Sequence, residues 1–294
     1  MIKFFRHIRK SLVEQNQMGK YLKYAIGEIL LVVIGILIAL QINTWNEQQK
    51  TKEKELKYLS LIKQEMEGNL QSIQFEQKVL DDFLVGIKQL LKWYAEPDPT
   101  LTNKQLSKIL VPILSKDMDF YFKNGTLNEI IATGNLKDIA NDSIRNILAS
   151  ISGNLERVRA QEKTLNDYIA KGNNYLEKKG SIKQIVVDAG RNQRYEIPAD
   201  SKEISNLFLL QSDEFENIMV YAALTGGSLD RENYATFHKE LQTLIALIDQ
   251  ELQQTNWYMD TETIIYVAAA ALILRVVIKV ILRYAKEQKE EESE

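Results

Sequence analysis

The most apolar stretch of this chain runs from residue 24 to residue 42 and contains only one charged residue, Glu28. About 19 residues, rising ~1.5 Å each, make a helix as long as the hydrocarbon core of a bilayer is thick. Tyr24 and Trp45 flank the stretch, as aromatic residues often do at the two membrane interfaces. The pattern predicts a transmembrane helix over residues 24–43.

A second apolar stretch, residues 264–282, contains two cations, Arg275 and Lys279. If this helix runs from the outside to the inside, both long side chains can reach the headgroups at its inner end. The stretch predicts either a second transmembrane helix or an amphipathic helix in the membrane interface, and a buried soluble helix is the remaining alternative. Residues 283–294 form a charged tail.

Two features of these stretches predict specific contacts. With two spans, Glu28 lies at a similar depth to Arg275 and Lys279, which predicts an intramembrane ion pair with one of them; alternatively, each charge reaches the interface separately. Gly35 and Ala39 lie about one helical turn apart, and small residues at this spacing allow helices to approach closely. They predict a helix-packing face for self-association or for packing on the second stretch, although such a pair also arises by chance in apolar runs.

Between the two stretches, apolar residues recur at intervals of three and four, the period of a helix that buries one face. This spacing predicts long, coiled-coil-like helices over residues 44–93 and 142–176, the first continuous with the predicted membrane helix. Shorter helices are predicted over residues 103–114, 126–133, 202–224 and 230–257. The apolar stripe of the first long helix is interrupted at Lys63 and Gln77 and comprises Leu59, Met66, Leu70, Ile73, Leu80, Leu84, Ile87 and Leu91.

Local signals divide these helices. Residues 182–197 place β-branched residues on both sides of a Gly-Arg-Asn sequence, which predicts a small β-hairpin. Thr126 and Glu129 fit a capping box that starts a short helix. Gly226 and Gly227 predict a turn between two helices. The predicted fold is mainly α: a membrane-anchored antiparallel helical bundle, residues 44–260, with long coiled-coil-like helices and a β-hairpin.

Basic residues gather before the first apolar stretch. Residues 1–43 carry six Lys or Arg and two acidic residues, whereas the whole chain carries 37 Lys and Arg against 40 Asp and Glu. The positive-inside rule places residues 1–23 in the cytoplasm as a basic segment. The helical domain is then periplasmic, on a bacterial inner membrane. A net charge of −3 does not suit a nucleic-acid-binding protein, and the absence of cysteine excludes disulfides and thiol nucleophiles.

Recognisable motifs for catalysis are absent from the sequence. His7 and His238 lack the neighbouring ligands of a metal site. Asp117 and Asp119 lack the glycine and the distal glutamate of a calcium loop, so a solvated turn is the simpler interpretation. We therefore predict no catalytic residues, no metal ligands and no cofactor.

The first apolar stretch also carries a family motif. After Met-Ile-Lys-Phe-Phe-Arg, the chain reads Tyr24-Ala-Ile-Gly-Glu-Ile29, Leu31-Val-Val-Ile-Gly-Ile-Leu-Ile-Ala-Leu-Gln-Ile-Asn43 and Trp45-Asn-Glu47. With Leu127-Asn-Glu-Ile-Ile131, it resembles an uncharacterised bacterial membrane-protein family, a domain of unknown function. The resemblance implies an N-terminal span and a helical extramembrane region, without an assigned activity. The C-terminal apolar stretch departs from the family pattern.

These observations favour a non-enzymatic, membrane-anchored helical module that binds a partner protein or small ligand, or scaffolds an envelope complex. Its expected partners are the lipid bilayer and either further copies of the chain or an envelope protein. The alternatives are an envelope enzyme, such as a hydrolase with dispersed carboxylates and tyrosines, and a ligand sensor that signals through the first helix. A deep polar pocket with acids of perturbed pKa would favour the enzyme, whereas a filled core with an exposed apolar groove would favour the binding module.

Overall fold

The computed structural model describes residues 18–200 and 202–254, together with Arg275 and Lys279. The chain divides into two compact units, residues 1–57 and residues 58–294. The described residues are mainly helical and contain no strand, which confirms the predicted fold class at this level.

The first unit contains the beginning of helix α2 (Met18–Ala95), a single helix with residues in both units. The large apolar side chains from Val32 to Ile42 are 44–60% exposed. Within the part of the chain that the structure describes, no helix has both the length and the apolar character that crossing a membrane requires. The predicted spans at residues 24–43 and 264–282 fall partly and almost wholly outside the described side chains, so both stay predictions.

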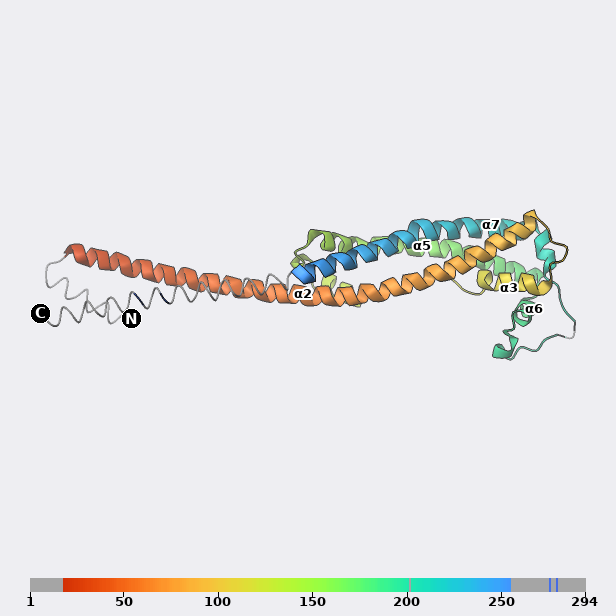
Figure 1. Cartoon of the computed structure of the whole chain (residues 1–294), viewed down its shortest axis with the longest axis horizontal. Coiled ribbons are helices and arrows are strands. Elements are labelled where there is room, and N and C mark those ends of the chain that lie inside the picture. The colour runs from red at the N-terminus through yellow and green to blue at the C-terminus, as the bar shows by residue number, and fades with distance from the viewer. Residues whose placement is uncertain (1–17, 201, 255–274, 276–278, 280–294) are drawn as a thin grey trace. The chain divides into compact units, whose positions relative to one another are not determined.

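The second unit is a helical bundle, as predicted. Helices α2, α5 (Asp142–Lys179) and α7 (Asp213–Ser228) run side by side (Figure 1). A π-helical turn, η4 (Leu229–Tyr234), joins α7 without a break to residues 235–254, which are α-helical.

The predicted turn at Gly226 and Gly227 is therefore wrong. Both glycines are buried within the continuous helix. A Cβ atom on Gly226 would lie 3.1 Å from Cε1 of Phe83 and 3.2 Å from Cδ2 of Leu84. The absence of a side chain at this position allows the helix to pack closely against α2.

The buried stripe of α2 differs from the predicted stripe at every second position. The positions buried as predicted are Leu59, Met66, Ile73, Leu80 and Ile87. The alternating buried positions are Ile62, Asn69, Glu76, Phe83 and Leu90, each one residue before the predicted position. Two of these core residues, Asn69 and Glu76, are polar. The spacing of apolar residues therefore could not indicate that they are buried.

An extended segment, residues 116–124, connects α3 (Asn103–Leu114) to α4 (Gly125–Ala132). Side chains of α2 and α5 satisfy part of its backbone. Asn69 accepts a hydrogen bond from the N–H of Lys123 and donates one to the carbonyl of Lys123, both at 2.7 Å. Asn166 bonds Met118 in the same two-way manner, both at 2.9 Å. The asparagines thus replace the hydrogen bonds that a neighbouring strand would supply.

Helix α4 is capped from α2 rather than by its own residues. The predicted capping box of Thr126 and Glu129 does not form. Instead, the carboxylate of Glu65 accepts hydrogen bonds from the N–H groups of Thr126, at 3.0 Å, and Leu127, at 3.2 Å. A carboxylate at this end satisfies free N–H groups and interacts favourably with the helix dipole. Gly134, with a φ of +69°, follows the helix and precedes the 3-10 turn η1 (Asn135–Asp138). The helix predicted over residues 126–133 therefore ends within one residue of the expected position.

The predicted β-hairpin at residues 182–197 is also wrong. The segment forms α6 (Ile182–Asp188) and the 3-10 turn η2 (Asn192–Tyr195). The hydroxyl of Ser181 caps α6 by accepting the N–H of Gln184 at 3.1 Å, and Ile185 packs in the core. A cap and a buried contact outweigh the weak strand preference of β-branched residues.

The helix predicted over residues 202–224 begins later than expected. A 3-10 turn, η3 (Leu207–Gln211), comes first, and α7 starts only after Ser212. The Ser212 hydroxyl caps α7 by accepting the N–H of Phe215 at 3.2 Å.

The chain enters and leaves the helical bundle at the same end. Lys63 of α2 forms an ion pair with Asp249, near the end of the last described helix, at 2.6 Å. At this end too, Asn141, which caps α5, donates a hydrogen bond to Glu251 at 3.3 Å. The points where the bundle connects to the rest of the chain are therefore neighbours.

Candidate functional site

The predicted membrane contacts are only partly covered by the structure. The side chain of Glu28 lies outside the described residues, and Arg275 and Lys279 are exposed. The ion pair among these three residues stays a prediction. Ala39 is exposed, and a Cβ on Gly35 would meet no atom within 4 Å, so nothing in the described structure occupies this predicted packing face.

A buried carboxylate joins three segments in the bundle core. Glu162 of α5 is 4% exposed, and its Oε1 accepts hydrogen bonds from the hydroxyl of Tyr234, at 2.5 Å, and the N–H of Phe120, at 2.9 Å. Burial raises the pKa of Glu162, although both hydrogen bonds oppose this shift. Burial and the nearby carboxylate raise the pKa of Tyr234, so its hydroxyl remains a neutral donor.

A second buried carboxylate, Glu76 of α2, faces a surface cleft of about 380 Å³ that Asp119 and Tyr121 also line. Among the described residues, no group is a hydrogen-bond partner of its buried Oε2. Its Oε1 lies 3.8 Å from Nζ of Lys116. Burial raises the pKa of Glu76, against the opposing effect of Lys116. In the described part of the chain, no group of three or more His, Cys, Asp or Glu side chains is arranged to hold a metal ion.

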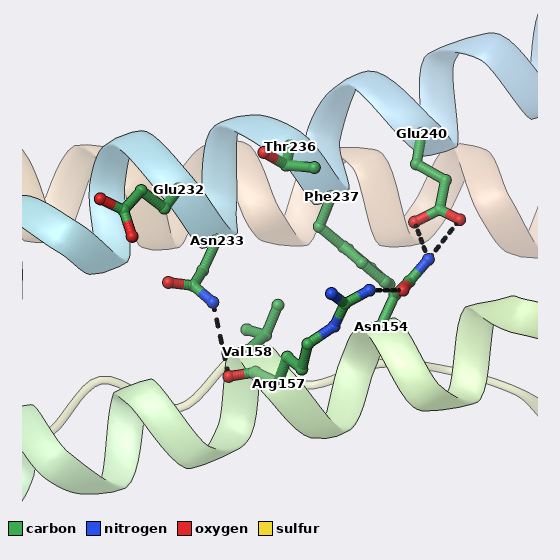
Figure 2. Close-up of a pocket in the computed structure, with 8 residues that line it drawn as sticks. All are labelled: Asn154, Arg157, Val158, Glu232, Asn233, Thr236, Phe237 and Glu240. Atoms are coloured by element: carbon green, nitrogen blue, oxygen red, sulfur yellow. Dashed lines mark hydrogen bonds between the residues drawn. The ribbon is translucent and has the colours of Figure 1, made fainter.

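A cleft of about 290 Å³ lies where α5 faces η4 and the helix that follows it (Figure 2). Asn154 donates hydrogen bonds to both carboxylate oxygens of Glu240, at 2.7 and 2.9 Å, and accepts one from Arg157. Burial raises the pKa of Glu240, while Asn154 and Arg157 lower it. Asn233 of η4 donates a hydrogen bond to the backbone carbonyl of Arg157 at 3.5 Å. These groups bind one another across the cleft and so fasten η4 to α5.

A larger groove of about 860 Å³, here called the tyrosine–lysine groove, lies between α5 and α7. Tyr168 and Tyr221 stack within it, with ring centroids 5.3 Å apart and planes 7° from parallel. The ammonium of Lys171 lies 4.3 Å from the centroid of the Tyr168 ring. Lys178 and Lys179 line the same groove. This groove therefore combines a stacked pair of aromatic rings with three lysines.

Residues 28–159 match the model of a family of unknown function, DUF6090. The predicted resemblance to an uncharacterised family is therefore confirmed. The DUF6090 region contains Glu65, Asn69 and Glu76 but ends before Glu162 and before every residue that lines the tyrosine–lysine groove. No curated protein and no solved structure matches the chain.

Glu76, Glu162 and the residues of the tyrosine–lysine groove carry no motif that indicates a site in the sequence. Glu162 and Gly172 fill the two gaps in the apolar spacing of α5, at positions where the period requires a buried residue. Such gaps are a usable signal, because a polar residue at a core position must be hydrogen-bonded. The stacking of Tyr168 on Tyr221 has no comparable signal, since it depends on how two helices pack.

Proposed function

We propose that this chain is a non-enzymatic module, anchored in the bacterial inner membrane, whose helical bundle lies outside the cytoplasm and binds a ligand or partner. One observation carries the anchoring: Lys63 and Asp249 pair where the chain enters and leaves the bundle. Apolar stretches that are connected along the chain to neighbouring points of the bundle can reach the same membrane. The positive charge before the first stretch supports the orientation.

The binding role is supported by the interior of the bundle. Its helices meet over a continuous apolar core in which Phe120, Phe122 and Phe237 contact one another edge to face. Two of the acids with raised pKa values, Glu162 and Glu240, are tied into this interior or into bonds between helices. The tyrosine–lysine groove lies on the surface. Open grooves on a rigid scaffold suit binding more than chemistry that requires exclusion of water.

Chemical labelling tests the topology, because the chain has no cysteine of its own. Single variants Thr100→Cys and Lys202→Cys place a thiol at exposed positions of the bundle, and Ser11→Cys and Glu294→Cys place one near each end. In intact cells with a permeable outer membrane, an impermeant maleimide should label the first two variants and spare the last two. Labelling of Ser11→Cys with protection of Thr100→Cys would reverse the orientation. Release of the protein by alkaline carbonate would refute the anchoring.

An enzyme with dispersed carboxylates is the second candidate, favoured by the position of Glu76 and Asp119 at one cleft. If the chain is such an enzyme, Glu76→Gln should fail to complement a deletion of the gene, although the folded variant is still present in the membrane. The binding module predicts that Glu76→Gln complements a deletion as well as the wild type. Complementation with parallel measurement of protein level therefore separates the two functions.

A further inference from the structure

The tyrosine–lysine groove is built by close packing of two helices. Gly172 lies on α5 between Tyr168 and Tyr175, and a Cβ at Gly172 would lie 2.9 Å from Cε of Met219 on α7. The missing side chain allows α5 and α7 to approach beneath the groove. At its end, the hydroxyls of Tyr175 and Ser212 are 2.7 Å apart and hydrogen-bonded, and Ser212 also caps α7. The floor is therefore fixed before any ligand arrives.

The aromatic surface of the groove is available on one side. The stack with Tyr168 covers one face of the Tyr221 ring, yet Tyr221 remains 54% exposed. Lys171 covers part of the Tyr168 ring. Tyr221 thus offers a flat apolar surface that is held in place by its neighbour, and a pyranose ring can place its C–H face against such a surface.

The charges in the groove favour a polyanion. Three lysines line it against one acidic residue, Glu214. Lys171 and Lys178 are seven residues apart on α5, so their backbones lie about 10 Å apart along the helix. Two cationic positions at this separation suit charges repeated along a chain more than a single phosphate. Asn174 and Asn217 also line the groove and add amide groups that can bond hydroxyls.

We propose that this groove binds an acidic polysaccharide, with carboxylates near the lysines and one sugar ring on Tyr221. The inference deepens the proposed function and rests on it only for the compartment in which the ligand is met. An acidic peptide would need partners for its own backbone amides, but the backbones of α5 and α7 are bonded within their helices. The groove offers side chains alone, which suits a ligand rich in hydroxyls.

Calorimetric titration of the full chain in detergent micelles tests this proposal. The probe is oligogalacturonate, with its methyl ester as the uncharged match and poly-glutamate of similar charge as the peptide match. Oligogalacturonate should bind, and its affinity should fall on raising the ionic strength to about 0.15 M because salt screens exposed charges. The methyl ester should bind about tenfold more weakly, as expected for the loss of ~1.4 kcal/mol.

Variants locate the binding. Tyr221→Ala should weaken oligogalacturonate binding about tenfold, the upper range for one aromatic stacking contact. Lys178→Ala combined with Lys179→Ala should reduce the salt dependence. Tyr121→Ala is the matched control, because Tyr121 is a tyrosine that is 70% exposed on another surface. This variant should bind oligogalacturonate with the affinity of the wild type. Circular dichroism on each variant confirms folding.

Three outcomes would overturn the inference: no binding of oligogalacturonate, equal binding by Tyr221→Ala, or tighter binding of poly-glutamate than of the saccharide. The last result would identify a peptide site. Binding in micelles does not depend on orientation, so failure of the thiol labelling would refute the proposed function and leave the groove assignment intact.

Discussion

The hydroxyl of Tyr234 and Oε1 of Glu162 form a 2.5 Å hydrogen bond inside the bundle, between the π-helical turn and α5. The N–H of Phe120 reaches the same oxygen, so the extended segment is tied to both helices through one atom. A π-helical turn costs good backbone geometry and is often retained for a specific role. Here it brings Tyr234 to a carboxylate that would otherwise have one bond fewer.

Replacing Glu162 tests the cost of burying this carboxylate. Because the folded-state pKa is raised, the stabilisation exists below the unfolded pKa and is lost as the pH rises through the folded pKa. Glu162→Gln keeps an acceptor oxygen for both donors and has no charge to desolvate. At pH 8 we expect the free energy of unfolding of Glu162→Gln to be up to about 1 kcal/mol higher than that of the wild type. This advantage should be lost near pH 4, where Glu162 is protonated. Urea unfolding followed by circular dichroism measures the difference, and parallel pH profiles would contradict it.

Asn69 should be among the most sensitive polar positions of α2. It is fully buried, and Asn69→Ala leaves both the N–H and the carbonyl of Lys123 without their partner. The expected loss in the free energy of unfolding is about 2–4 kcal/mol. Asn174→Ala, an exposed substitution on α5, should stay within about 0.5 kcal/mol of the wild type. Equal unfolding midpoints for the two variants would show that the backbone of Lys123 finds other partners.

Two glycine-to-alanine changes should act in opposite directions. In Gly226→Ala the new methyl group would crowd the Phe83 ring, and overpacking of this kind costs about 1–3 kcal/mol. Gly153 lies at an exposed position of α5, and in Gly153→Ala the methyl group would meet no atom within 4 Å. The better helix propensity of alanine should therefore stabilise the protein by about 0.5–1 kcal/mol. Thermal unfolding distinguishes them. A stabilising Gly226→Ala would mean that α7 does not pack closely on α2.

The cap of α4 should depend on a residue about sixty positions earlier in the chain. Glu65→Ala removes the acceptor for the N–H groups of Thr126 and Leu127 and should cost about 1 kcal/mol. Glu67→Ala is the control, since the exposed side chain of Glu67 forms a surface ion pair with Lys63 at 3.5 Å, and such pairs contribute little to stability. Amide hydrogen exchange should speed up in residues 125–132 for the first variant alone. Unchanged protection in both variants would exclude Glu65 as the cap.

The sequence predicted the regular helices more accurately than the contacts between them. Residues 103–114 and the start of α5 at Asp142 were correctly bounded, because apolar spacing and capping residues are local signals. Asn69, Glu76 and Glu162 were missed because each is a polar residue whose partners come from distant segments. Glu65 shows the same limit: its role as a cap is visible only when α4 is placed against α2.

The common end of the bundle also determines how it would respond to force. Tension that pulls residues 58 and 254 apart would load the Lys63–Asp249 pair first. It would then separate α2 from the helix over residues 235–254 by breaking one layer of contacts after another. A pull along the length of α2, from residue 58 towards its far end at Ala95, would instead load all the layers together in shear. The same set of contacts would therefore yield readily to tension between its two connections and resist tension along its axis.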